Sequence, residues 1–199
     1  MTRRRGVAGL LLTPGAGADR DQPALVAIDA ALTTAGVGVE RLDFPYRVAG
    51  RRAPDRPPVL VAAVVEAAAA LAASLGVAAR RVAVGGRSMG GRMCSMAVAE
   101  GLDAAALVLV SYPLHPPGKP EQLRTAHFGA IDVPCLFVSG TRDAFAAPAE
   151  LEAAVAAIPA PVTLSWLEGG DHGLRRRDGE VAALVRDWLL ELAPGPGRR

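Results

Sequence analysis

The sequence predicts an α/β fold, a doubly wound and mainly parallel six-stranded sheet with helices on both of its faces. Three observations predict it. Short apolar runs alternate with longer helical stretches along the whole chain, as in parallel strands joined by crossover helices. Several of these runs are nearly continuous, which is typical of strands buried on both faces. The length of 199 residues suits a single domain over residues 1–199.

The predicted strands are apolar runs bounded by Gly, Pro or Asp, at residues 6–12, 37–44, 80–86, 105–112, 134–140 and 162–168. Helices are predicted at 21–36, at about 58–76, from 89 onward, from 148 onward and from 178 to about 194, with Pro or Asp near most starts and Gly or Pro near most ends. The stretches 47–58 and 113–122 are expected to be irregular, and residues 1–5 and 193–199 are expected to fray.

Composition excludes some classes of protein. The formal net charge is only +2, whereas nucleic-acid binding needs a clustered basic excess. The two cysteines, Cys94 and Cys135, lie in apolar segments and are expected to be buried thiols in a reducing compartment. The basic and apolar start resembles a short signal peptide, but the fold requires residues 6–12 as a strand. We expect no apolar run near the ~20 residues of a membrane span, and therefore a cytoplasmic protein without a membrane partner.

Ser88 stands in the glycine-rich stretch GGRSMGGR, between a predicted strand and a predicted helix. The spacing Gly86-x-Ser88-x-Gly90 is that of a nucleophile elbow, in which the serine is strained and its neighbours must lack side chains. A glycine-rich turn without catalytic function is the alternative. The position favours the elbow, because chemistry in an open parallel sheet gathers at the carboxyl ends of the strands.

A serine hydroxyl needs a base, and the base needs an orienting acid. His172 follows the last predicted strand and Asp143 follows the one before it. The chain order Ser, Asp, His, with each residue at a strand end, predicts a catalytic triad. Asp171 is a weaker candidate acid, because adjacent side chains in a loop usually diverge, and Asp132 precedes its strand.

An oxyanion needs donors near the nucleophile. We expect one to be the backbone N–H of Met89, at the start of the helix after the elbow. The second is expected from the glycine loop after the first strand, where Ala16 is best placed. Histidines and cysteines show no metal-ligand spacing, so neither a metal nor another cofactor is expected.

Arginines crowd residues 47–56 and 175–177, and Arg87 lies within the elbow. We predict that one or two of them, with Arg47 and Arg87 as candidates, bind a substrate carboxylate or phosphate. A solvated charged surface is the alternative. His115, which also follows a strand, is a further candidate at the mouth of the site, although its position among four prolines favours a structural role.

Taken together, GGRSMGG, SGTRD, GGDHG, the first glycine loop and DFPYRVAGRRAPD resemble the small, lidless branch of the α/β-hydrolase superfamily, near dienelactone-hydrolase-like proteins, over residues 6–191. The resemblance implies a minimal α/β-hydrolase fold without a cap domain. It also implies a serine hydrolase with Ser88, Asp143 and His172 as its triad. Pro14-Gly15 departs from the His-Gly often found in the oxyanion loop, and two strands that usually precede the first are absent.

The predicted function is a serine hydrolase that cleaves a small ester or thioester through an acyl-enzyme. Two alternatives remain open. One is a binding or scaffold protein that keeps an inherited triad without using it, since fold alone does not fix function. The other is a different reaction on the same triad, of the perhydrolase or lyase type. The sequence does not indicate an oligomeric state.

Overall fold

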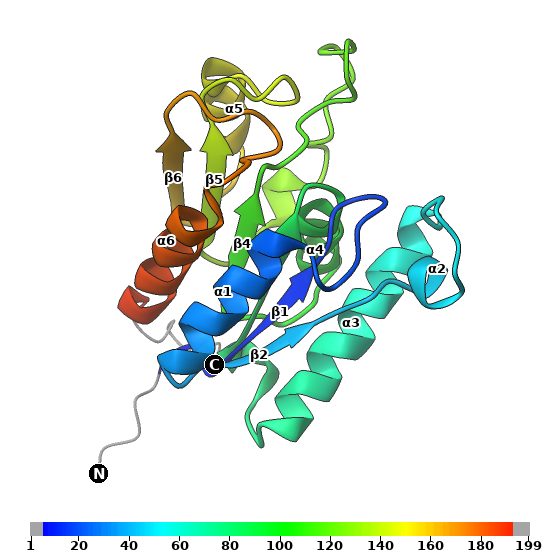
Figure 1. The fold of residues 1–199 in the computed structure, drawn as a ribbon, viewed down its shortest axis with the longest axis vertical. Coiled ribbons are helices and arrows are strands. Elements are labelled where there is room, and N and C mark those ends of the chain that lie inside the picture. Colours follow the sequence, from blue (N-terminus) through cyan, green and yellow to red (C-terminus); the bar gives the residue numbers. More distant parts are fainter. Residues whose placement is uncertain (1–5, 193–199) are drawn as a thin grey trace.

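The computed structural model describes residues 6–192, so the ends expected to fray, 1–5 and 193–199, lie outside the described residues. Its sheet contains six parallel strands in the order β2-β1-β3-β4-β5-β6 (Figure 1). The strands are β1 Gly9–Thr13, β2 Gly38–Arg41, β3 Val82–Arg87, β4 Leu107–Val110, β5 Cys135–Gly140 and β6 Val162–Leu167. The predicted fold class is confirmed, and each strand falls within or one residue beyond its predicted run.

Helices connect the strands and cover both faces of the sheet. The α-helices are α1 Pro23–Thr34, α2 Pro45–Val48, α3 Pro57–Ser74, α4 Met89–Ala99, α5 Pro148–Val155 and α6 Asp178–Glu191, with short 3-10 turns at Ala79–Arg81 and Phe128–Ala130. Several of these helices begin at proline, whose fixed φ and missing N–H suit the first helical turn. The short α2 was not predicted, because four residues are too few to show a helical period.

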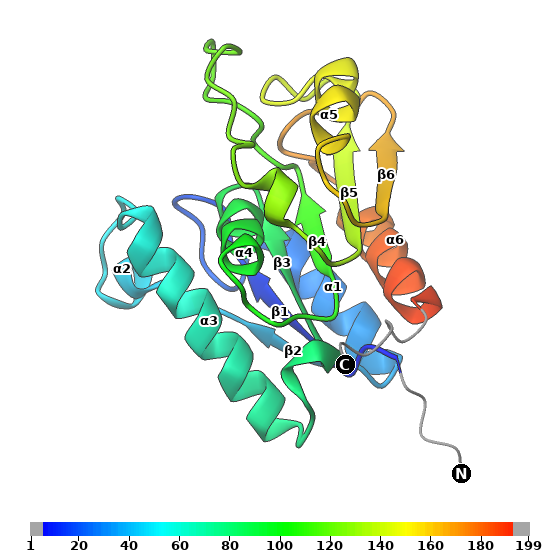
Figure 2. The ribbon, with the colours of Figure 1, turned by 180° about the vertical axis from the view of Figure 1, so that it is seen from behind.

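The side chains of each strand divide between two cores. In β1, Leu10 and Leu12 belong to the core that also contains α1 and α6 residues, whereas Leu11 belongs to the core that contains α3, α4 and α5 residues. Figures 1 and 2 show these two layers of helices from opposite sides of the sheet. Because successive side chains point to opposite faces, a strand that is covered on both faces must be apolar throughout. This explains the nearly continuous runs in the sequence.

The sheet has a topological switch point between β1 and β3. The chain leaves β1 through α1 toward the edge strand β2, and then returns through α3 to β3 on the other side of β1. At such a point the loops after the two strands diverge to opposite faces and leave a crevice at the carboxyl ends. The loop after β3 carries Ser88.

The expectation that no apolar run reaches membrane-spanning length is wrong for α3. This helix of 18 residues is long and apolar enough to cross a membrane by length and composition. In the structure it lays one stripe of side chains against the core, namely Leu60, Val61, Val64, Ala68, Leu71 and Ala72. Alanines on its exposed face account for much of its remaining apolar character.

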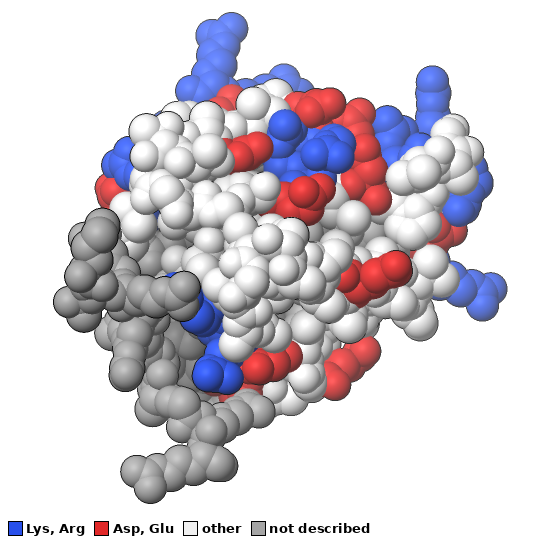
Figure 3. Space-filling model, turned by 90° about the horizontal axis from the view of Figure 1, so that it is seen from below, with Lys and Arg blue, Asp and Glu red and all other residues white. Residues whose placement is uncertain are grey.

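Charges are mixed on the surface that is visible from below in the view of Figure 1. Figure 3 shows Lys and Arg interspersed with Asp and Glu on this side, with wide uncharged areas between them. Among residues 6–192, this face therefore carries no continuous basic surface of the kind that binds nucleic-acid backbones.

Candidate active site

Ser88 lies at the sharp turn between β3 and α4. Its backbone has φ 51° and ψ −116°, and a positive φ at a residue other than glycine stores strain. The turn is held because the Ser88 amide donates a hydrogen bond of 2.8 Å to the Val110 carbonyl at the end of β4. The serine side chain is thereby placed beyond the carboxyl ends of the central strands.

The glycines around Ser88 are needed because the end of β1 packs directly against the turn. A Cβ atom on Gly86 would collide with the side chain and the carbonyl of Thr13. On Gly90 it would lie 2.5 Å from the Thr13 carbonyl oxygen and 2.6 Å from that of Pro14. Real Cβ atoms do not approach backbone so closely, so only glycine lets β1, β3 and α4 meet here.

The three predicted triad residues lie within hydrogen-bond distance of one another. Ser88 Oγ is 2.9 Å from His172 Nε2, and His172 Nδ1 is 2.9 Å and 3.0 Å from the two carboxylate oxygens of Asp143. The Asp143 side chain is fully buried and also accepts the Phe145 amide at 2.8 Å. With Nδ1–H donating to the carboxylate, Nε2 is left to accept the serine proton.

Close backbone contact joins the loops that carry Asp143 and His172. A Cβ atom on Gly140, at the end of β5, would collide with the backbone of Gly170. The Arg142 amide donates to the Gly170 carbonyl at 2.8 Å. These contacts fix the spacing between the acid and the base, and they give a physical reason for the glycines in SGTRD and GGDHG.

Two further side chains hold His172. The Phe145 ring stacks on the imidazole with a centroid separation of 4.1 Å and an interplanar angle of 27°. Arg87 Nη2 donates to the His172 carbonyl oxygen at 2.7 Å, and burial lowers the pKa of this guanidinium. Arg87, which was predicted to bind a substrate anion, therefore stabilises the loop of His172 instead. No sequence signal pointed to Phe145 beyond its place two residues after the acid.

Hydrogen bonds hold the loop after β1 on both sides of Ala16. The Gly15 amide donates to Gln22 Oε1 at 3.0 Å and the Gly17 amide to the Tyr46 hydroxyl at 3.3 Å. Between them, the Ala16 amide has no acceptor within residues 6–192. Ala16 lines a pocket with Ser88 and Met89. The residues of both predicted oxyanion donors thus lie at the pocket that contains Ser88.

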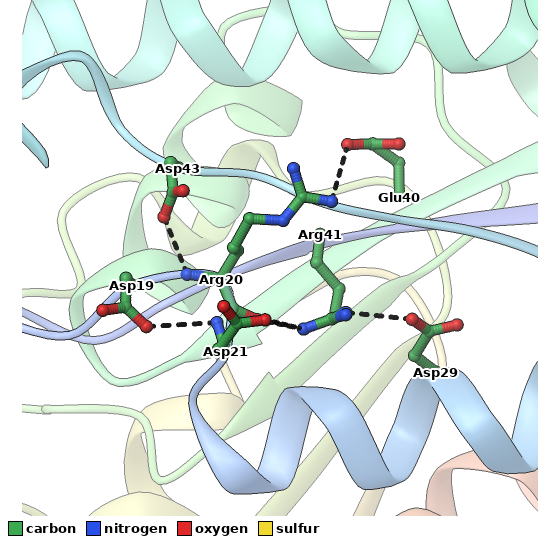
Figure 4. A network of polar contacts seen from close by, with 7 residues as sticks. All are labelled: Asp19, Arg20, Asp21, Asp29, Glu40, Arg41 and Asp43. Carbon is green, nitrogen blue, oxygen red and sulfur yellow. Dashed lines mark hydrogen bonds and ion pairs between the residues drawn. The ribbon is translucent and has the colours of Figure 1, made fainter. Parts of the chain in front are cut away.

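A network of charges ties the end of this loop to β2 and α1 (Figure 4). Arg41 bridges Asp21 at 2.8 Å and Asp29 at 2.9 Å, and these contacts raise its pKa, with the hydrogen bond to Asp21 as the largest cause. The Arg20 amide donates to Asp43 at 2.7 Å. A loop anchored at both ends can present the Ala16 amide without rearrangement, as oxyanion stabilisation requires.

The pocket beside Ser88 has a volume of about 310 Å³. Its apolar wall includes Leu60, Met93, Pro113 and Phe145. Two of the residues predicted to bind substrate lie elsewhere. Arg47 pairs with Asp19 at 3.3 Å. His115 is buried, with Nδ1 2.9 Å from the Pro116 carbonyl and Nε2 3.5 Å from Glu150.

The arginines that do line the pocket are Arg92 and Arg124, and neither was predicted from the sequence. Arg92 stands four residues after Ser88, a spacing that places both on one face of a helix, so a sequence signal existed for it. Arg124 had none, because it reaches the site from the long connection between β4 and β5.

Other reactive groups do not compete with Ser88. Burial raises the pKa of both thiols, Cys94 and Cys135, to about 12, so neither forms the thiolate that a cysteine nucleophile requires. In the part of the chain that the structure covers, no three His, Cys, Asp or Glu side chains gather in a way that could hold a metal ion.

The lowered pKa of the third histidine, His127, predicts that the stability of the protein depends on pH. Burial, followed by the Arg92 charge, lowers its pKa to about 4 from the ordinary 6.5. As the pH drops, His127 is therefore protonated near pH 6.5 in the unfolded chain but only near pH 4 in the folded protein. Because the unfolded state binds more protons between these values, the free energy of unfolding should fall across this window as the pH drops. The full shift corresponds to about 3 kcal/mol; because the ring is partly exposed, we expect about 1–2 kcal/mol.

Urea unfolding of the wild type and His127→Gln at pH 7 and pH 4.5 measures this effect. Glutamine keeps a polar group near Ser95 Oγ, which lies 2.8 Å from His127 Nε2, but cannot titrate. The variant should lose less stability than the wild type between the two pH values. Equal losses would show that His127 does not control the acid response.

Comparisons with known proteins place the chain in a family. The model of the alpha/beta hydrolase domain matches residues 6–186. Among solved structures, an alpha-beta serine hydrolase homologue from Coxiella burnetii superposes with a TM-score of 0.76 at 19% identity, covering 92% of this chain and 85% of that chain. A dienelactone hydrolase from Anabaena variabilis gives 0.74 at 19% identity, covering 94% and 88%.

Est1E from Butyrivibrio proteoclasticus gives a TM-score of 0.75 at 15% identity, covering 96% of this chain and 90% of that chain. At such identities the similarity to solved structures concerns the fold alone. The family match, in contrast, spans nearly all of the described chain, including β3, the Ser88 turn and the loops of Asp143 and His172. The chain belongs to the α/β-hydrolase family.

Proposed function

We propose that the protein is a serine hydrolase that cleaves a small ester or thioester. The observation that carries the proposal is the unbroken series of short contacts from Ser88 Oγ through the His172 ring to the buried Asp143 carboxylate. A strained serine, a base and an orienting acid at three strand ends are the parts that acyl transfer needs. Folding alone does not require them to meet at a pocket.

In the proposed reaction, Ser88 Oγ attacks the substrate carbonyl carbon while His172 Nε2 takes the hydroxyl proton. The buried Asp143 carboxylate stabilises the imidazolium that forms. The tetrahedral intermediate collapses as the bond to the alcohol or thiol breaks, and His172 returns the proton to that leaving group. Water then attacks the acyl-enzyme while His172 Nε2 takes a proton from it. His172 returns this proton to Ser88 Oγ as the carboxylic acid is released.

The amides of Met89 and Ala16 support the oxyanion in this scheme. The Met89 N–H is the first of α4, so the helix dipole adds to its hydrogen bond. The Ala16 N–H belongs to a loop whose neighbouring amides are already bound. Donors fixed before the reaction stabilise a developing charge without a reorganisation cost.

Labelling with a fluorophosphonate probe tests the nucleophile. The probe should phosphonylate the wild-type protein, and Ser88→Ala should abolish labelling, because within residues 6–192 no other hydroxyl is hydrogen-bonded to His172. Ser95→Ala serves as a control, since Ser95 Oγ is hydrogen-bonded to a different histidine, and should still label. Labelling that persists in Ser88→Ala would refute the assignment.

The shape of the pocket predicts a preference for short acyl groups. Between β4 and β5 the described chain contains only the 3-10 turn Phe128–Ala130, so no lid deepens the site. Each added methylene gains at most ~0.8 kcal/mol, about fourfold in kcat/KM, while it stays buried. Rates on p-nitrophenyl acetate, butyrate, octanoate and palmitate should therefore stop rising at short chains. A kcat/KM that climbs to palmitate would reveal a deep acyl channel.

We also propose a cytoplasmic location, supported by two cysteines that are both buried and unpaired. Oxidising compartments favour disulfides in small domains. Fractionation of the native host with an antibody to this chain tests the location.

A further inference from the structure

Two arginines stand on the wall of the Ser88 pocket without a counter-ion. Arg92 and Arg124 both line it. Neither makes an ion pair or a side-chain hydrogen bond within the described residues. Arginines that reach a partly buried site are normally paired or hydrogen-bonded, because an uncompensated charge removed from water is costly.

Arg92 is held close to the nucleophile by α4. Its amide donates to the Ser88 carbonyl at 3.1 Å, so it lies one helical turn after Ser88, on the same face. Its Nε atom is buried and has no hydrogen-bond partner. The Arg92 guanidinium therefore carries an unsatisfied donor, and the same residue lines the pocket of Ser88.

Arg124 is fixed through its backbone. Its amide donates to the Leu114 carbonyl at 2.8 Å, and its carbonyl accepts the Tyr112 hydroxyl at 2.7 Å. Burial and the nearby Arg92 charge lower the pKa of Arg124. Two like charges that affect each other thus line the same pocket, and a bound anion would relieve their repulsion.

The other polar groups near this pair do not neutralise it. Asp55 also lines the pocket, and its Oδ1 pairs with Arg51 at 2.7 Å, whereas its Oδ2 is buried without a hydrogen-bond partner. No ion pair joins Asp55 to either pocket arginine. The pKa of Tyr112 is raised to about 12 by burial, so its phenol stays neutral. The lowered pKa of His127 keeps that ring neutral as well.

We propose that Arg92 and Arg124 bind a carboxylate of the substrate, so that the preferred substrate is a short ester that carries a free carboxylate, such as a half-ester of a small dicarboxylic acid. The planar guanidinium fork matches a carboxylate in geometry as well as in charge. The pocket of about 310 Å³ suits a small molecule of this kind. This inference rests on the proposed hydrolase function and names the substrate class of the same site.

The kinetic test compares monoethyl glutarate with its neutral amide analogue, ethyl 5-amino-5-oxopentanoate, by ethanol release. A charged hydrogen bond of the usual strength predicts a preference of about tenfold or more in kcat/KM for the carboxylate. Arg92→Gln and Arg124→Gln should each bring the ratio toward one, mainly through KM. Arg80→Gln is the matched control: Arg80 is exposed and lies before the amino end of β3, so the ratio should stay as in the wild type.

A binding test separates this inference from the proposed function. Glutarate is titrated calorimetrically into Ser88→Ala protein, with and without Arg92→Gln. Binding that Arg92→Gln removes supports the carboxylate site even if no ester is hydrolysed, in which case only the proposed function fails. Ester turnover with equal rates on the two substrates and no glutarate binding would overturn the inference, as would a preference unchanged by either arginine variant.

Two further measurements sharpen the result. Inorganic phosphate is titrated in the same way, and Arg92-dependent binding tighter than that of glutarate would assign the site to a phosphate instead. The melting temperature of Arg92→Gln should match or exceed that of the wild type, because the substitution removes an unpaired, partly buried charge. A marked drop in melting temperature would give Arg92 a structural role and overturn the assignment.

Discussion

Asp143→Asn is expected to lower kcat by about 10⁴-fold and to leave the fold intact. The Asp143 carboxylate accepts hydrogen bonds from His172 Nδ1 and from the Phe145 amide. An asparagine amide has one oxygen, which can continue to accept the Phe145 N–H. Its NH₂ group then faces the imidazole and favours the tautomer with hydrogen on Nε2. In that tautomer Nε2 cannot take the serine proton.

The measurement is kcat on a short p-nitrophenyl ester, with thermal unfolding of both proteins to check the fold. Asp171→Asn provides the matched control, because it removes the neighbouring carboxylate without touching the contacts between His172 and Asp143. We expect its kcat to stay within a few-fold of the wild type. Near-normal activity of Asp143→Asn would exclude Asp143 as the orienting acid, and its unfolding would make the residue structural.

The sheet was predictable because each strand has to satisfy two cores at once. All five residues of GLLLT in β1 are buried, and its three leucines divide between the two cores. The strand begins at glycine, and Pro14 follows its last residue. Exact bounds were less predictable. The predicted run 37–44 pairs only over Gly38–Arg41, because the following residues leave the sheet toward α2. Backbone pairing ends where the tertiary structure redirects the chain, and apolar composition does not record that point.

The meeting of Ser88, Asp143 and His172 could be predicted because parallel strands bring their carboxyl ends to one edge of the sheet. The order of the strands places the three residues near one another, although they are far apart in the sequence. The partners of the arginines were harder to predict, because a guanidinium in a loop binds whichever acceptor the folded chain brings near it. Arg47 pairs with Asp19, and Arg87 donates to the His172 carbonyl oxygen. Neither acceptor is evident from the local sequence.

Gly86→Ala is expected to destabilise the protein by about 3 kcal/mol and to abolish most of its activity. The added methyl group would collide with the Thr13 side chain and carbonyl oxygen. The obstacle is the backbone of the adjacent strand β1, which pairs Thr13 with Gly86, so no rotamer change relieves it. Overpacking against atoms that cannot move costs at the upper end of the usual range. Separating β1 from β3 would also displace Ser88 and Ala16 relative to each other.

Gly179→Ala gives the matched control with the opposite sign. Gly179 lies in the first turn of α6 and a Cβ atom there would meet nothing within 4 Å, so alanine should stabilise the helix by up to about 1 kcal/mol. Urea unfolding measures both variants, and p-nitrophenyl acetate turnover separates them, since Gly179→Ala should keep full activity. If Gly86→Ala were as stable and as active as the wild type, β1 could not pack against the Ser88 turn as the structure shows, and the glycines of GGRSMGGR would need another explanation.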